Sequence, residues 1–306
     1  MKKILSIDGG GIKGVFSASF LTQIEEKCQI AIHEYFDLIA GTSTGGIIAA
    51  ALAYGIPAKD ILNLYLQNGN KIFPKRKGWP ILKTKYKTEP LKKVLEDVFQ
   101  DACIKDCKTR LVIPAYNIEN DKVRVFKTPH ADDLFFDKNI KLVDCILATT
   151  AAPLYFSPYR MQGGRYIDGG VGANNPSLIA LVEGLTRCAW SANEISMLSV
   201  GGVNELGHNT GGEHMGLVDA LKIQKSFMSA ESQYAHNICS ILLPKGQYVR
   251  INQEVKKQFA LDNATYSGMR ELKNYGDNQA MISISQIKTI FLKEKIEKML
   301  LYNIEG

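Results

Sequence analysis

The chain has 306 residues, of which 45% are hydrophobic, and it carries a formal net charge of +6 at pH 7. This is enough apolar material for one sizeable core, and the chain contains no repeat or low-complexity tract. Length alone permits two domains, but no linker rich in glycine, serine or proline divides the sequence. We therefore expect a single domain over 1–306. We expect no nucleic-acid partner, although the modest charge by itself does not decide this point.

Neither an export signal nor a metal motif is legible in the sequence. The apolar run at 4–7 is far shorter than the apolar core of a signal peptide. The longest apolar stretch, 45–58, is shorter than a bilayer span. Cys103 and Cys107 have no second pair nearby that would complete a metal site. We therefore expect a cytoplasmic protein with free thiols, no metal and no cofactor.

A glycine-rich turn, Asp8-Gly9-Gly10-Gly11-Ile12-Lys13-Gly14, joins a predicted strand at 3–7 to a predicted amphipathic helix at 15–27. Such a turn presents backbone N–H groups to an anion. Its spacing satisfies G-x-G-x-x-G, but a dinucleotide site also needs an acidic residue at the end of the second strand, and none stands there. A P-loop is excluded because Val15 follows Gly14. Two interpretations remain open, an oxyanion hole and a tight turn without a ligand.

A serine between glycines follows. Gly41-Thr42-Ser43-Thr44-Gly45-Gly46 stands between an apolar run at 35–40 and a predicted buried helix at 47–53. Such a strand-to-helix turn holds a hydroxyl out of a sheet as a nucleophile, with Gly41 and Gly45 leaving room for a sharp turn and for substrate. Ser43 would also lie at a helix N-terminus, which favours developing negative charge. Because the first two strands of an α/β unit usually lie side by side, the turn at 8–14 would supply oxyanion donors to this serine.

Basic and aromatic residues alternate over 71–87. Lysine and arginine side chains suit anionic head groups, and Phe73 and Trp79 suit the membrane interface, so this segment predicts a membrane-docking surface. The same mixture would suit nucleic acid or nucleotide phosphates, and a solvated basic loop is the plain alternative.

The remaining elements continue the α/β pattern. We predict strands at 110–116, 122–126 and 195–200, and helices at 142–150, at 176–188 with Asn175 as the cap, and at about 280–301. A short apolar run also ends in Asp168-Gly169-Gly170, which places a carboxylate on an uncrowded turn within reach of a serine on another strand. The last third, about 215–306, is predicted to be a helical part without a catalytic motif, whose apolar pattern indicates core or an oligomer face.

The turn at 8–14, the Ser43 motif and Asp168-Gly169-Gly170, in that order, resemble the motifs of the patatin-like phospholipase family. The match extends to Ala148–Phe156 and covers roughly residues 3–200. The resemblance implies an α/β fold, namely a three-layer α/β/α sandwich with a mostly parallel central sheet, and catalytic motifs within 4–205.

The resemblance also implies lipid acyl hydrolysis by a catalytic dyad. Carried over to this chain, the nucleophile is Ser43 and the general base is Asp168. The oxyanion hole falls on Gly9, Gly10 and Gly11. Lys13 fills a position that is basic in many relatives, and no role is assigned to it.

Chemistry alone leaves a dyad and a triad to be weighed. Ester hydrolysis by a serine needs a base for its proton and donors for the tetrahedral oxygen, and the base is usually a histidine. His208, His214 or His236 would complete the order Ser, Asp, His of an α/β-hydrolase. The nucleophile of that fold follows several strands, whereas Ser43 follows the second, so we favour the dyad.

The length, the start at 4–8 and the missing export signal are similar to the effector phospholipases of cyclic-nucleotide-activated antiphage systems. That resemblance implies a membrane phospholipid substrate, peripheral contact with the inner membrane surface and a cyclic nucleotide activator, and it is compatible with a homo-oligomer. A constitutive housekeeping lipid esterase is the first alternative. A nucleotide-binding module without hydrolase activity is the second, and the missing acid after the second strand argues against it.

Overall fold

The computed structural model describes residues 1–74, 84–205 and 217–302, and for residues 217–225 it describes the backbone alone. Its strands are β1 (Lys2–Ile7), β2 (Leu38–Gly41), β3 (Arg110–Asn117), β4 (Lys122–Lys127), β5 (Tyr159–Met161), β6 (Gly164–Ile167), β7 (Ile195–Glu205) and β8 (Tyr248–Val255). Its α-helices are α1 (Gly14–Cys28), α2 (Thr44–Tyr54), α3 (Ala58–Ile72), α4 (Glu89–Phe99), α5 (Leu142–Thr149), α6 (Gly170–Ala173), α7 (Ser177–Thr186), α8 (Leu217–Leu242) and α9 (Tyr266–Phe291).

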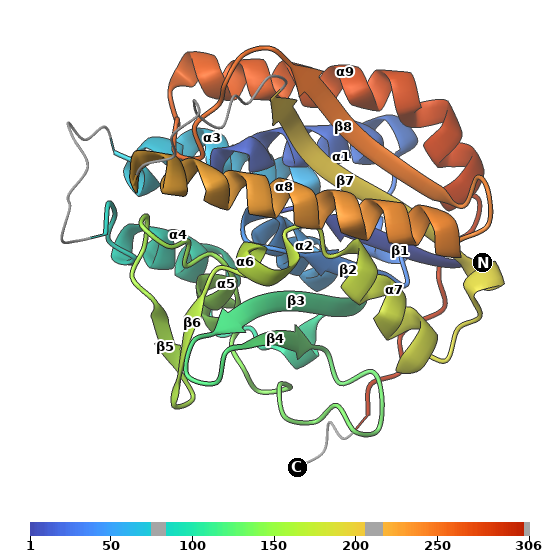
Figure 1. Cartoon of the computed structure of the whole chain (residues 1–306). Helices are drawn as coiled ribbons and strands as arrows, with labels where there is room; N and C mark the ends of the chain where they lie inside the picture. Colours follow the sequence, from blue (N-terminus) through green and yellow to red (C-terminus); the bar gives the residue numbers. More distant parts are fainter. Residues whose placement is uncertain (75–83, 206–216, 303–306) are drawn as a thin grey trace.

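Across the described residues the strands form one mixed sheet in the order β5-β6-β3-β2-β1-β7-β8, with β4 paired to β3 (Figure 1). The five strands from β3 to β8 along this order run parallel to one another. Strands β4 and β6 are antiparallel to β3, and β5 is antiparallel to β6. The predicted mostly parallel sheet is confirmed.

The sheet is covered by helices on both faces because its central strands are apolar on both sides. On β1, Leu5 belongs to the larger core cluster together with residues of α1, α2, α3, α5 and α9. The neighbouring Ile4 faces the other way, into a second cluster with Leu181 of α7 and Cys239 of α8. This alternation along a strand produces the predicted three-layer α/β/α sandwich.

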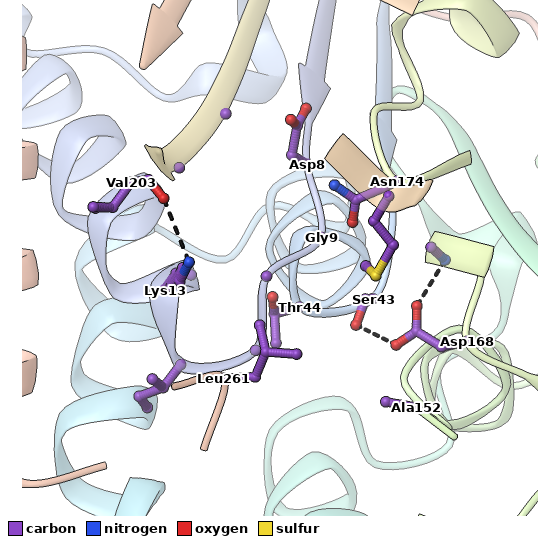
Figure 2. Close-up of a pocket in the computed structure, with 18 of the residues that line it drawn as sticks. Asp8, Gly9, Lys13, Ser43, Thr44, Ala152, Asp168, Asn174, Val203 and Leu261 are labelled. Atoms are coloured by element: carbon purple, nitrogen blue, oxygen red, sulfur yellow. Dashed lines mark hydrogen bonds between the residues drawn. The ribbon is translucent and has the colours of Figure 1, made fainter. Parts of the chain in front are cut away.

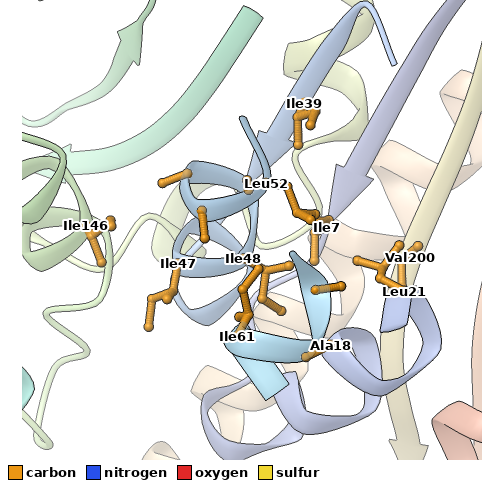
Figure 3. Packing of buried hydrophobic residues seen from close by; sticks show 14 of the residues in the cluster. Ile7, Ala18, Leu21, Ile39, Ile47, Ile48, Leu52, Ile61, Ile146 and Val200 are labelled. Carbon is orange, nitrogen blue, oxygen red and sulfur yellow. The ribbon is translucent and has the colours of Figure 1, made fainter. Parts of the chain in front are cut away.

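Helix α2 follows the strand-to-helix turn at Ser43, which we call the elbow. Every residue of this helix from Thr44 to Ala53 is buried. Figure 3 shows Ile48 and Leu52 of this helix gathered with Ile7 of β1 and with Ile61 of α3. A helix that is apolar all round needs such surroundings, because no face of it suits water. The start of α2, where Ser43 lies, is therefore held rigidly by the core.

The C-terminal part departs from the prediction in two ways. The long helix, expected at about 280–301, is α9, which begins at Tyr266 and ends at Phe291. The part from about 215 to 306 is not purely helical, because β8 adds a parallel edge strand next to β7. Ile287 and Phe291 of α9 are fully buried, as expected for core positions, and Phe291 stacks on Phe36.

Several boundaries also differ from the sequence-based predictions. Strand β2 begins at Leu38 rather than near residue 35, because residues 32–34 form a 3₁₀ turn. Helix α7 begins at Ser177, and its cap position is Pro176, although the side-chain oxygen of Asn175 does accept a hydrogen bond from the Ser177 N–H. No helix in the described part of the chain is both long and apolar enough to cross a membrane.

Much of the predicted docking segment at 71–87 lies outside the described residues, which exclude 75–83. At its edges, Lys71 donates to the side-chain oxygen of Asn68 at 3.0 Å. Lys85 forms an ion pair with Asp262 at 2.5 Å, and both side chains are largely buried. Lys85 therefore serves the fold, which is not what the prediction for this segment assigned to its lysines.

Candidate active site

Ser43 lies at the sharp turn between β2 and α2, in a backbone conformation that L-residues rarely adopt. Its φ is 55° and its ψ is −123°, and its side chain is 7% exposed. A conformation of this kind costs about 1–3 kcal/mol and persists only where the surroundings enforce it. Here the carbonyl of Ser43 accepts the N–H groups of Gly46 and Ile47 and so begins helix α2.

The glycines around Ser43 serve close packing of the backbone. A Cβ on Gly45 would lie 2.3 Å from the carbonyl oxygen of Ile7, and a Cβ on Gly41 would lie 2.1 Å from that of Gly45. The elbow is thus pressed against the end of β1, where any side chain would clash. Neither glycine has a positive φ, so the strained residue of the turn is the serine itself rather than its neighbours.

Asp168 follows β6 and points at Ser43 (Figure 2). Its Oδ2 accepts a hydrogen bond from the Ser43 hydroxyl at 2.5 Å, and its Oδ1 accepts one from the Gly170 N–H at 2.7 Å. Burial raises the pKa of Asp168 to about 6, and these two hydrogen bonds oppose the rise. A carboxylate with such a pKa is ionised at neutral pH yet is a stronger base than an ordinary aspartate.

The turn that carries Asp168 is as tightly packed as the elbow. A Cβ on Gly169 would lie 2.1 Å from the carbonyl oxygen of Pro114 on β3. A Cβ on Gly170 would lie 3.0 Å from Oδ1 of Asp168 and 2.9 Å from the terminal methyl group of Met228 on α8. Both glycines therefore let neighbouring parts of the same chain, β3 and α8, pack closely around the turn that holds the carboxylate.

The glycine turn after β1 lies beside Ser43, as predicted, but its three glycines differ. The N–H of Gly9 donates to the carbonyl oxygen of Asn174 at 3.0 Å, so the prediction of Gly9 as an oxyanion donor does not fit this geometry. The N–H groups of Gly10 and Gly11 form no hydrogen bond with any described residue. Gly11 has a φ of 59°, and a Cβ there would lie 2.3 Å from the carbonyl oxygen of Leu261. Gly10 and Gly11 are the candidate donors that remain.

Thr149, at the end of α5, connects the serine and the aspartate. Its hydroxyl oxygen accepts the N–H of Ser43 at 2.9 Å and donates to the carbonyl of Pro114 at 2.6 Å. Its carbonyl oxygen accepts the N–H of Gly169 at 3.2 Å. Sequence reasoning predicted the helix at 142–150 and found the segment after it through the family resemblance. It assigned no role to Thr149, because a buried threonine at a helix end carries no chemical signature.

The histidines do not form a triad within the described residues. The buried His130 ring lies 3.1 Å from a carboxylate oxygen of Glu183. The ring of His236, on α8, lies 3.2 Å from the hydroxyl of Tyr248. Neither ring, nor that of His33, forms a hydrogen bond with Ser43 or Asp168 there. His208 and His214 lie outside the described residues.

Lys13 has a structural contact at the rim of the site. Its ammonium lies 2.5 Å from a carboxylate oxygen of Glu205, whose side chain is 2% exposed. The same oxygen of Glu205 accepts the N–H of Phe259, two residues before Leu261. Lys13 therefore helps to hold the segment that lies against the glycine turn, since the carbonyl of Leu261 accepts the N–H of Ile12 at 2.7 Å.

A pocket of about 1330 Å³ opens over Ser43, Asp168 and the glycine turn. One part of its wall is apolar and comes from α3, α4 and the segment after α5; it includes Leu64, Tyr65, Ile72, Phe73, Leu91 and Phe156. The other part is mainly polar and comes from β7, β8 and α8. Within the described residues, no three histidine, cysteine, aspartate or glutamate side chains gather so as to hold a metal ion. The site is suited to the transfer of an acyl group from a ligand with an apolar chain to a serine nucleophile.

Comparisons with known proteins agree with this geometry. The family model described as patatin-like phospholipase matches residues 5–181, which is more than half of the chain. A "cGAMP-activated phospholipase" of Vibrio cholerae is 32% identical over 94% of this chain and 93% of the relative. A protein of the same description from Escherichia coli is 38% identical over 59% of this chain, which spans only 55% of that relative's length.

Among solved structures, VipD from Legionella pneumophila superposes with a TM-score of 0.51 over 93% of this chain and 66% of VipD, at 14% identity, which supports the fold alone. The class of protein is an α/β serine hydrolase acting on lipid acyl groups. The chain belongs to the patatin-like phospholipase family.

Removal of the Thr149 hydroxyl should impair the nucleophile without removing it. We expect Thr149→Val to lower kcat by about 10–100-fold with little change in KM, because Ser43 loses the acceptor that holds its backbone. Thr149→Ser keeps the hydroxyl and should restore most of kcat. Steady-state kinetics on a soluble acyl ester tests this pair, and a loss in Thr149→Ser with a normal rate in Thr149→Val would show that the methyl group matters and the hydroxyl does not.

Proposed function

We propose that the protein is a phospholipase of the A type that cleaves acyl esters of membrane phospholipids through a Ser43–Asp168 dyad. The observation that carries this proposal is the 2.5 Å hydrogen bond from the Ser43 hydroxyl to a buried carboxylate. Family membership supports the lipid acyl substrate, and the names of the relatives as phospholipases support phospholipid in particular.

The reaction follows from the positions of these groups. Ser43 Oγ attacks the ester carbonyl carbon while Asp168 accepts the hydroxyl proton, and the N–H groups of Gly10 and Gly11 stabilise the tetrahedral oxyanion. The C–O bond to the alcohol then breaks, and Asp168 returns the proton to the leaving alkoxide. Water deprotonated by Asp168 attacks the acyl-enzyme in the same way, which releases the fatty acid and regenerates Ser43.

The apolar part of the pocket suits the acyl chain. Phe73 lies in ring contact with Tyr86 and with Phe156, at centroid separations of 5.3 and 6.0 Å. Burial of a long acyl chain against such a surface gains about 0.8 kcal/mol for each methylene group removed from water. The dyad therefore stands next to a surface that selects esters of long-chain acids.

Loss of either dyad member should abolish turnover. We expect Ser43→Ala and Asp168→Asn each to lower kcat by about 10³-fold or more on phospholipid micelles. Labelling by a fluorophosphonate should disappear in Ser43→Ala. A variant of Asp168 with near-normal turnover would sink the dyad and revive a histidine as the base.

The wild-type pH profile gives an independent readout of the same residue. The rate constant kcat/KM should fall about tenfold per pH unit below an apparent pKa near 6, because Asp168 must be ionised to act as the base. Stability has the opposite sign, since a carboxyl whose folded-state pKa is raised makes its stabilising contribution at low pH and loses it as the pH rises through 6. Asp168→Asn should therefore melt several degrees higher than wild type at pH 8 and little differently at pH 3.5.

We propose further that a cyclic dinucleotide switches the enzyme on, as in antiphage effectors. Support comes from the Vibrio cholerae and Escherichia coli relatives, which are both named cGAMP-activated phospholipases. This chain matches the first of them over nearly its whole length. Phospholipid hydrolysis should rise at least tenfold on addition of cGAMP, and Ser43→Ala should stay inactive with it. Full activity without any nucleotide would favour a constitutive housekeeping lipid esterase instead.

We also propose that the active enzyme is peripheral at the inner membrane surface of the cytoplasm, where its substrate lies. This proposal rests on the sequence alone, because the basic residues Lys75, Arg76 and Lys77 would attract anionic lipid head groups. Their triple replacement by glutamate should reduce co-sedimentation with vesicles containing anionic phospholipid severalfold, whereas Lys122→Glu on β4 should not. Unchanged sedimentation of the triple variant would argue that another surface meets the membrane.

A further inference from the structure

The two parts of the pocket wall lie on opposite sides of the serine in the order of the sheet. Ser43 follows β2 and the glycine turn follows β1, while β7 and β8 continue the sheet beyond β1. The apolar part rests on the other side, because α5 packs on β3 and contacts α4. A ligand with its ester at Ser43 therefore meets an apolar surface in one direction and the surface formed by α8, β7 and β8 in the other.

Helix α8 lines this pocket mainly with polar side chains, beside Met228 and Ala230, and it exposes several large apolar side chains to solvent. Ser229, Ser232, Gln233 and His236 line the pocket. The outward side chains of Phe227, Tyr234 and Ile241 are 70, 72 and 80% exposed, respectively. An ordinary surface helix has the reverse arrangement, with its apolar side against the protein. The inner face of α8 is thus built to contact water or a polar ligand rather than to fill a core.

The C-terminal end of α8 anchors this arrangement. Cys239 and Leu243 belong to the second core cluster with Met197 of β7. Nearer the N-terminal end of α8, the Glu231 carboxylate accepts the N–H of Asn175, and the Asn174 side chain donates to the hydroxyl of Ser232 at 2.9 Å. These contacts fix the polar stripe of α8 relative to the loop that also holds Gly9.

Strand β8 supplies the facing wall of the same polar part. Arg250 donates both terminal nitrogens to Asp8 and one of them also to Ser199, so its charge is neutralised by a bidentate pair. A Cβ on Gly201 would lie 1.9 Å from the side-chain amide of Asn252 and 2.7 Å from a terminal nitrogen of Arg250, so a glycine in β7 is what lets these side chains lie across it. Among the described residues, the wall therefore offers hydroxyl and amide groups together with the carboxylate of Glu254, which is exposed and lines the pocket.

We propose that this polar part, lined by Ser229, Gln233 and Asn252, binds the phosphate-bearing head group of the phospholipid while the acyl chain to be cleaved lies along α3 and α4. The inference rests on the proposed phospholipase function. A phospholipid ester has an apolar acyl chain on one side of its carbonyl carbon and a polar alcohol on the other. The pocket likewise has an apolar wall on one side of Ser43 and a polar wall on the other. The alcohol is then on the side of Met228, which lies against the Asp168 turn, so the leaving oxygen is close to the group that protonates it.

The polar part comes from residues outside the region that the family model matches, which ends at 181. Strands β7 and β8 and helix α8 all follow that limit. The dyad and the glycine turn thus lie within the region that the family model matches, whereas the surface facing the alcohol lies in the C-terminal part beyond it. Hydroxyl and amide groups suit a phosphodiester linked to a short hydroxylated or amino alcohol.

The test blocks the polar part without touching the dyad. Ser229 and Gln233 are both exposed to the pocket and form no hydrogen bond with other described residues, so their replacement breaks no known contact. Ser229→Leu and Gln233→Leu should each lower kcat/KM for phosphatidylethanolamine in mixed micelles about tenfold, the value of a hydrogen bond or two in the complex. Hydrolysis of a p-nitrophenyl ester of the same fatty acid, which lacks a head group, should stay within twofold of wild type.

Asn237→Leu, on the same helix but outside the pocket, is the matched control and should behave as wild type on both substrates. Equal phospholipid activity in Gln233→Leu and wild type would overturn the head-group site while leaving the proposed function intact. A cyclic dinucleotide is the other phosphodiester that would suit this surface. If so, Gln233→Leu would lose activity on both substrates together and regain it at higher cGAMP concentration, which would also overturn the assignment. A wild-type enzyme that cleaves the p-nitrophenyl ester but not phospholipid, with and without cGAMP, would refute the proposed function and this inference together.

Discussion

The hydrogen bond between Ser43 and Asp168 is the contact on which the rest of the site depends. It joins the ends of β2 and β6, which are not neighbours in the sheet because β3 lies between them. Neither Ser43 nor Asp168 alone fixes the distance between the two side chains. Thr149 contacts both sides and is itself bound to β3, so the reacting pair is held through one side chain at the end of α5. The 2.5 Å separation is therefore a property of the packed sandwich rather than of either motif.

The two residues that form this contact oppose stability, each in its own way. Ser43 holds a strained backbone conformation, and Asp168 keeps an ionised carboxylate in a buried position at neutral pH. Together they cost several kcal/mol, a large share of the net stability of a domain. The two apolar clusters that enclose the sheet offset this cost. The full burial of α2 is thus a functional requirement, since a looser helix would let Ser43 relax to an ordinary conformation.

The sequence allowed the chemistry to be predicted better than the architecture around it. Ser43 and Asp168 were found because a small residue pattern at a strand end has few other uses, and the structure brings the two side chains together. Gly9 was misassigned because its sequence does not show that Asn174, far along the chain, accepts its N–H. Strand β8 was missed because its side chains alternate between apolar and polar within a segment that otherwise has a helical period. Tertiary partners decide both cases, and local pattern does not contain them.

The C-terminal part therefore does more than complete the core. Helix α9 packs along α1, where a Cβ on Gly276 would lie 2.4 Å from the carbonyl oxygen of Phe16, and the segment before it places Leu261 against the glycine turn. Helix α8 holds Asn174, whose carbonyl holds Gly9. Two C-terminal elements thus contact the candidate oxyanion loop from different sides. A ligand that moves either element would change the positions of the Gly10 and Gly11 N–H groups, so the proposed substrate selection and the proposed activation would act on the same few backbone atoms.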